Sequence, residues 1–119
     1  MLKSLSKILK LNMSNSKKKW FVNSTRAESW DGKNGSPNVH TDFDAHETLE
    51  SARNDIRSRI GHITSNPLNR LEWINWLTNR VEVRFNYQND GAGTIRQTYV
   101  LEIMEIDGEG NLKWIDVGY

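Results

Sequence analysis

Residues 40–47 are the one stretch of this chain with enough metal-ligand and acid–base side chains for chemistry. The candidates are His40, Asp42, Asp44, His46 and Glu47. If the chain is extended here, alternate side chains share one side, and the last two can reach back toward the others. Imidazole and carboxylate groups together suit zinc, manganese or iron, with Asp42 or Glu47 as general base. The structural alternative is that the acids cap a helix and favour its dipole, while the histidines are merely exposed.

The element that must position this cluster is a helix predicted over residues 45–60. Its buried face is Ala45, Leu49, Ala52, Ile56 and Ile60, spaced four, three, four and four. Asp44 takes the N-cap position, with Glu47 at the capping-box spacing, and Gly61 is the stop signal. The small residues on the buried face would let the helix lie close to a sheet.

That sheet is predicted mainly from a three-stranded antiparallel meander over residues 80–119. Residues 80–87 alternate apolar and polar side chains, which is typical of a half-buried strand. Residues 95–106 are apolar on both sides in places, which predicts the central strand. Residues 112–117 form the last strand, and its edge is predicted to be open. Lys113 is the only cation on it that would disfavour pairing with another edge, so two copies of the chain could form a homodimer there.

Two further segments complete the fold. Residues 20–25 predict an edge or near-edge strand, and residues 30–38 a long loop rich in turn formers. Asn66 and Pro67 have the pattern of a helix start and predict a second helix through residue 79. A strand is the alternative there, because the apolar residues also alternate.

The predicted fold is therefore α+β, in the order β-α-(α)-β-β-β. It has a mainly antiparallel four-stranded sheet with one long helix packed on one face. This order resembles the cystatin or nuclear-transport-factor-like arrangement. The resemblance covers only the order of elements, because the chain lacks the Gln-x-Val-x-Gly loop of cystatins and residues 61–79 match neither family. It therefore assigns a role to no residue.

Charge divides the chain into a basic arm, residues 1–17, and a single domain, residues 18–119. The first 26 residues contain seven cations and no acid, whereas residues 27–119 contain nine cations and 15 acids, a net charge of −6. Three interpretations of the arm remain open. It is a dispensable flexible extension, an organellar targeting peptide, or a binding arm for nucleic acid, an anionic membrane or an acidic partner.

Composition excludes several function classes. The 119-residue chain has no cysteine, so disulfides, thiolate metal sites and a cysteine nucleophile are excluded, and a reducing, cytoplasmic location is expected unless the arm is a targeting signal. No apolar run approaches the roughly 20 residues of a membrane span. No nucleotide fingerprint or recognisable catalytic motif is present, so no cofactor is expected.

The leading functional hypothesis is a small non-enzymatic protein-interaction module, of inhibitor or adaptor type. Five tryptophans are many for this length, and exposed tryptophan marks binding hot spots. The candidates for partner binding are Trp30, Trp73 and Trp76. An acidic body would steer the protein toward a basic partner.

The alternative hypothesis is binding of single-stranded nucleic acid. Lysines beside aromatic rings supply the charge and the stacking that such binders use. The residues concerned are Lys17, Lys18, Lys19, Trp20 and Phe21. A metal-dependent enzyme using residues 40–47 is the third hypothesis.

Overall fold

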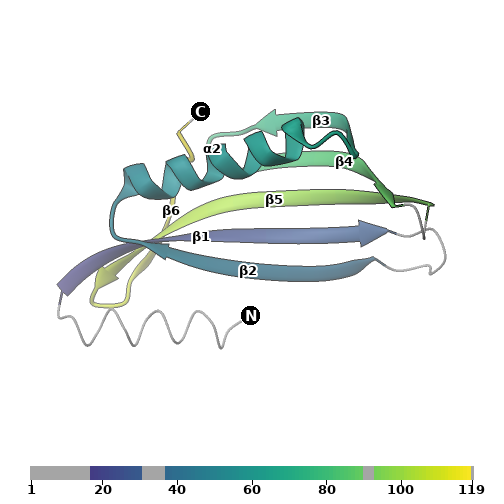
Figure 1. The fold of residues 1–119 in the computed structure, drawn as a ribbon. Coiled ribbons are helices and arrows are strands. Elements are labelled where there is room, and N and C mark those ends of the chain that lie inside the picture. The colour runs from purple at the N-terminus through teal and green to yellow at the C-terminus, as the bar shows by residue number, and fades with distance from the viewer. Residues whose placement is uncertain (1–16, 31–36, 90–92, 119) are drawn as a thin grey trace.

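The computed structural model describes residues 17–30, 37–89 and 93–118, so the predictions for the arm before residue 17 and for the middle of two loops lie outside it. The elements are β1 (Lys17–Trp30), β2 (Asn38–His46), α2 (Leu49–Ser65), β3 (Asn69–Trp76), β4 (Val81–Asn89), β5 (Gly93–Gly108) and β6 (Leu112–Ile115). Figure 1 shows one sheet with the helix on one of its faces. Within these residues, no helix has the length and hydropathy needed to cross a bilayer.

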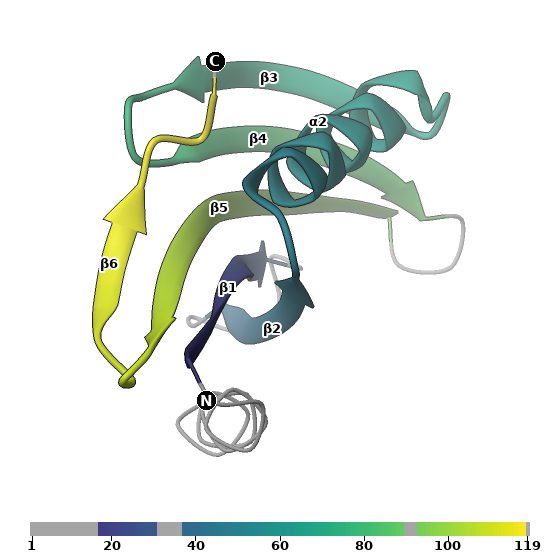
Figure 2. The same cartoon turned by 90° about the vertical axis from the view of Figure 1, so that its left-hand side faces the viewer.

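The six strands form one antiparallel sheet in the order β2-β1-β5-β4-β3, with β6 also paired to β5. The 16-residue β5 is the centre of the sheet, as predicted, because β1 follows one of its edges while β4 and then β6 pair with its other edge. The predicted meander of β4, β5 and β6 is confirmed. Seen end-on, the sheet curves around the helix and β6 lies away from it (Figure 2).

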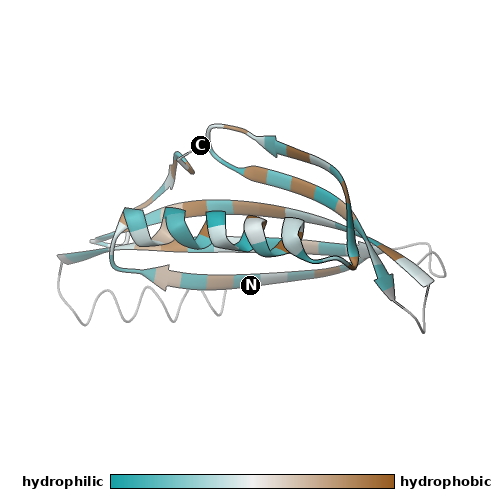
Figure 3. Cartoon of the chain, turned by 45° about the horizontal axis from the view of Figure 1, so that its top comes forward, coloured by the Kyte–Doolittle hydropathy of each residue, from teal (hydrophilic) through white to brown (hydrophobic). Residues whose placement is uncertain are grey.

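The main core lies between the helix and the sheet. Ala52, Ile56 and Ile60 are buried on the helix and pack with Val83 of β4 and Leu101 of β5, among others. Figure 3 shows the alternation of hydrophobic and hydrophilic residues along the strands that makes this packing one-sided. The predicted apolar face of the helix is therefore confirmed in its last three positions.

The predicted ends of the helix are wrong. Residues 38–46 pair with β1 as a strand, so Ala45 and Asp44 belong to β2, and Thr48 is the N-cap, accepting a hydrogen bond from the Ser51 amide at 3.1 Å. Gly61 does not stop the helix. A glycine inside a helix costs only about 1 kcal/mol, and the packing of Ile63 against the core carries the helix past it.

The second helix predicted over residues 66–79 is wrong, because β3 occupies this segment and pairs with β4. A register shift between Leu71 and Trp73 marks a β-bulge. The bulge places Leu71 and Ile74 on the same face although they are three residues apart, which imitates helical spacing. Asn66 caps the end of α2 instead of starting a new helix.

The four-strand count is also wrong. The first strand is longer than the predicted residues 20–25 and lies inside the sheet, because β2 folds back along its free edge. Two strands therefore precede the helix, which departs from the order on which the cystatin-like resemblance was based. The coarser prediction holds: the described residues form an α+β fold, with one helix on one face of a large antiparallel sheet.

Candidate functional site

Four of the five tryptophans project from the face of the sheet that the helix does not cover, here called the helix-free face. Paired residues of an antiparallel sheet point to the same side. Trp20, Trp30 and Trp114 pair with Ile106, Arg96 and Met104 of β5, and Trp73 pairs with Arg84 of β4. These partners alternate with the core residues that face the helix, so all four indoles belong to the opposite face.

On β6 this face carries two neighbouring exposed apolar side chains. Trp114 and Leu112 are two residues apart on the same side of the strand and remain 53% and 49% exposed. They lie beside Met104 and Ile106, which are buried and form a second, smaller apolar cluster with Val22. Within the part of the chain that the structure describes, β6 pairs only with β5, so its other edge is open.

Acidic residues surround β6. Residues 105–118 contain four acids, Glu105, Asp107, Glu109 and Asp116, and a single cation, Lys113. Hydrogen bonds from the Asn111 amide above all, and from its side chain and the amides of the turn, hold the pKa of Asp107 below its usual range. This carboxylate therefore stays charged. Glu105 is in register with Lys113 on the opposite face and lies 3.6 Å from Lys19, so the negative charge near Leu112 comes from the turn that precedes β6.

The opposite end of the helix-free face carries Trp30, which is 38% exposed. With Asn86, Thr94 and Arg96 it lines an open cavity of about 300 Å³. Trp30 was predicted to be exposed, and it is.

The cations of the helix-free face are largely neutralised. Arg26 pairs with Glu28 at 2.6 Å, Arg80 with Glu82 at 3.2 Å, and Arg96 with Glu72 at 3.7 Å. The Arg84 guanidinium instead lies 5.2 Å from the Trp73 ring centroid, and its Nε donates to the Thr98 hydroxyl at 3.0 Å. Burial raises the pKa of Glu102, at the middle of this face, while the charge of Arg80 opposes the shift.

The structure separates the three tryptophans that the sequence grouped as partner-binding. Trp30 and Trp73 are on the helix-free face, but Trp76 is half-buried on the other face and packs against the main core. Trp114 is more exposed than any of them. Trp114 was not among the predicted binding residues because β6 alternates too briefly for its buried face to be identified.

The basic stretch at the start of β1 is divided in the same way. Lys18 Nζ lies 4.8 Å from the Trp20 ring centroid and pairs with Glu47 at 2.7 Å, and Lys19 lies 3.6 Å from Glu105. Phe21 packs against the main core on the helix side. The Lys17 side chain lies outside the described residues. The ring pair expected for stacking is therefore on opposite faces.

The cluster of residues 40–47 is also dispersed along β2. His40 Nε2 lies 3.0 Å from Asp42 Oδ1 in an exposed pair, Asp44 pairs with Arg59, and His46 Nδ1 lies 2.8 Å from Ser51 Oγ. Among the residues that the structure describes, no three histidine, aspartate or glutamate side chains are placed to hold a metal ion.

Sequence analysis also missed a polar cluster between α2 and the sheet. Asn23 is only 1% exposed, and its Nδ2 donates to the Ala52 carbonyl at 2.9 Å and to Asp55 Oδ2 at 3.0 Å. His46 Nε2 lies 3.6 Å from the same Asp55 oxygen, which also accepts from Arg59 Nε at 3.1 Å. Serine, histidine and aspartate therefore meet here, but the carboxylate is engaged by asparagine and arginine, and the cluster ties the helix to the sheet.

Comparison with known protein families, with curated proteins and with solved structures finds no match to this chain. Its function must therefore be argued from the described surfaces.

Proposed function

We propose that this protein is a small non-enzymatic protein-interaction module whose interface is centred on β6. The observation that carries the proposal is the pair of half-exposed side chains, Trp114 and Leu112, on one side of a strand with an open edge. Tryptophan is enriched among the residues that dominate binding energies. An open strand edge can add an extended partner segment through main-chain hydrogen bonds, with the neighbouring side chains providing specificity.

The proposed partner is a basic protein. Asp107 and Glu109 lie in the turn that precedes Leu112, and residues 27–119 as a whole carry a net charge of −6. A negative rim around an apolar centre would speed encounter with a positively charged surface and disfavour acidic ones.

Single-stranded nucleic acid is the second candidate, favoured by one observation, the stacking of Lys18 over Trp20. The pairing of Lys18 and Lys19 with carboxylates weighs against it, because cations that are already neutralised release fewer counterions at a polyanion. The two candidates differ in salt dependence. Nucleic-acid binding must weaken steeply with salt, whereas a contact centred on Trp114 keeps most of its affinity.

A quantitative pull-down with the full chain tests the proposal. Bound protein is compared for the native protein, Trp114→Ala, Leu112→Ala and the control Leu68→Ala, at low and high salt. Leu68 is 47% exposed, close to the 49% of Leu112, but lies outside β6. We expect the two β6 variants to lose a partner that the control retains.

The same partner must bind directly when purified. Equal recovery with all variants would refute the proposal, as would recovery of nucleic acid alone. Light scattering of the isolated protein identifies the remaining case, in which a second copy of this chain pairs along the β6 edge.

A further inference from the structure

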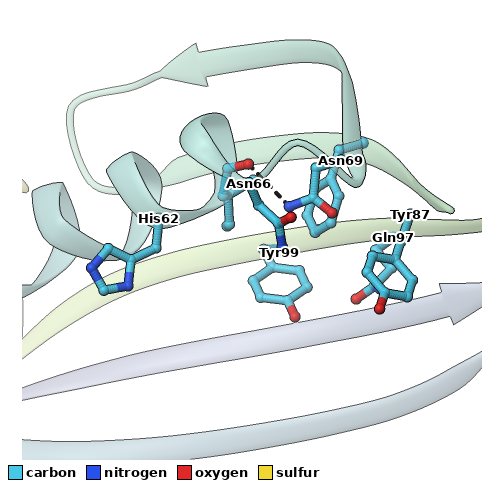
Figure 4. A pocket seen from close by; sticks show the side chains of 8 residues that line it. His62, Asn66, Asn69, Tyr87, Gln97 and Tyr99 are labelled. Atoms are coloured by element: carbon cyan, nitrogen blue, oxygen red, sulfur yellow. Dashed lines mark hydrogen bonds between the residues drawn. The ribbon is translucent and has the colours of Figure 1, made fainter. Parts of the chain in front are cut away.

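A pocket of about 280 Å³ lies on the other face of the sheet, where α2 ends. Its walls come from the last turns of the helix and from β3, β4 and β5 (Figure 4). The lining residues are His62, Ile63, Asn66, Asn69, Phe85, Tyr87, Gln97 and Tyr99. None of them belongs to the surface around β6, so this pocket is independent of the proposed interface.

The pocket exists because the sheet extends further than the helix that covers it. α2 ends at Ser65, whereas β4 continues to Asn89 and β5 begins at Gly93. Beyond Phe85, the helix side of these strands is therefore covered only by the last turn of α2 and the connection that follows it.

The pocket is open, and the connection from α2 to β3 beside it is held by hydrogen bonds. Asn69 Nδ2 donates to the Ile63 carbonyl at 3.0 Å, and the Asn69 amide donates to the Asn66 carbonyl at 3.0 Å. The Leu68 carbonyl accepts from the Gln88 amide at 2.9 Å, which ties the connection to β4. Because these bonds already fix the backbone of the connection, little conformational entropy is lost there when a ligand binds.

Aromatic rings form the floor. Phe85 is buried, and its ring centroid lies 5.4 Å from that of Tyr99 at an interplanar angle of 56°. Tyr87 and Ile63 are half-buried beside them. A flat apolar molecule would therefore contact ring faces and edges on more than one side.

The polar groups of the lining are available to a ligand. Within the described residues, the side chains of Tyr87, Gln97, Tyr99 and His62 make no hydrogen bond to one another or to the rest of the chain. Burial raises the pKa of Tyr99 above its ordinary value, aided by the charge of Asp42 and opposed by that of Arg59. Its hydroxyl is therefore protonated at neutral pH and can donate.

The lining contains no aspartate, glutamate, lysine or arginine. An ion entering the pocket would lose hydration without gaining a charged partner, which is costly. A neutral molecule with both donors and acceptors would instead satisfy the two hydroxyls and the Gln97 amide. The volume corresponds to about nine waters at about 30 Å³ each, which is the small end of ligand pockets.

From these observations we infer that the pocket at the end of α2 is a binding site for a small, uncharged aromatic molecule that carries an amide or a similar hydrogen-bonding group. Ring contacts with Phe85, Tyr87 and Tyr99 supply the affinity. Hydrogen bonds to Gln97 and to the tyrosine hydroxyls orient the ligand.

Benzamide is the probe that tests this site, and benzoate is its charged counterpart of the same shape. In a titration of isotope-labelled full-length protein followed by NMR, benzamide should give saturable amide shifts confined to the pocket segments of α2, β3, β4 and β5. A ligand of this size should bind with a dissociation constant on the order of 1 to 10 mM. Benzoate should bind at least about tenfold more weakly, because the lining holds no lysine or arginine.

Two variants block the pocket from opposite sides. Gln97→Trp fills it from the sheet and Ile63→Phe from the helix, so that one remains informative if the other lowers the melting temperature severely. Either folded variant should abolish the benzamide shifts, Tyr99→Phe should weaken binding by about 3- to 10-fold, and Trp114→Ala should leave it unchanged. Absence of saturable shifts, shifts that survive blocking, or equal binding of benzoate would overturn the inference.

Discussion

Replacing the buried Asn23 by alanine is expected to destabilise the protein by uncoupling the helix from the sheet. The substitution removes the hydrogen bonds from Asn23 Nδ2 to the Ala52 carbonyl and to Asp55 Oδ2. A neutral hydrogen bond contributes about 1 kcal/mol and one to a charged group at least about 1.5 kcal/mol. We use the lower figure for Asp55 because its side chain is 27% exposed.

An opposing contribution comes from the other end of the same side chain. Asn23 Oδ1 is buried and has no hydrogen-bond partner among the described residues, so its removal returns about 1 kcal/mol of desolvation cost. The net loss in the free energy of unfolding is therefore about 1.5 kcal/mol. With a urea dependence of about 1.5 kcal/mol per molar, the unfolding midpoint should fall by about 1 M.

Urea unfolding followed by tryptophan fluorescence measures this shift. Asn54→Ala is the matched control, because Asn54 is an asparagine on the same helix whose side chain makes only an exposed hydrogen bond, from Arg57. The loss of that bond and the gain in helix propensity oppose each other, so the stability should change by less than about 1 kcal/mol. The effect of Asn23→Ala should shrink by about 1 kcal/mol or more in an Asp55→Ala background. Unchanged or increased stability of Asn23→Ala, or full additivity with Asp55→Ala, would refute the assigned hydrogen bonds.

Three further predictions follow from the helix and the helix-free face. Gly61→Ala should stabilise the protein by about 1 kcal/mol in thermal or urea unfolding, because Gly61 lies in a helix and its added methyl group meets no atom within 4 Å. Thr48→Ala should cost about 1 kcal/mol in the same assay, since it removes the N-cap bond to Ser51. Glu102→Gln should raise the melting temperature more at pH 7 than at pH 3.5. The raised pKa of Glu102 means that the native protein holds this proton more tightly than the unfolded chain, so its contribution to stability is lost as pH rises through the native pKa.

The strands that follow simple alternation could be predicted from the sequence. β4 and β5 carry β-branched and aromatic residues at alternate positions, and glycines mark the turns beside them, so the meander and the central position of β5 were correct. The apolar face of α2 was correct for the same reason, because its period of 3.6 continues through three buried positions.

The errors arise where strand pairing overrides local helix signals. The acids of residues 40–47 imitate a helix start, but nine residues of β2 pair with β1, and strand pairing prevails over capping. The bulge in β3 breaks the period of two and imitates a helix. Both pairings are hairpins between consecutive strands, but the helix-like signals inside β2 and β3 concealed them.

The candidate sites were less predictable than the fold. Composition identified tryptophan as the residue to follow, but only the register shows that four indoles share one face and that Trp76 does not. The pocket at the end of α2 depends on the helix being shorter than the sheet, which no local pattern encodes.

Site-specific photocrosslinking tests the central claim most directly. A photoreactive phenylalanine analogue replaces Trp114 in one protein and the comparably exposed Leu68 in the other. An interface centred on β6 predicts a discrete protein adduct from position 114 but not from position 68. When unlabelled protein is added as a competitor, the native protein should reduce the yield of this adduct more than the Leu112→Ala variant does. Equal adducts from both positions, or adducts with nucleic acid alone, would contradict the proposed interface.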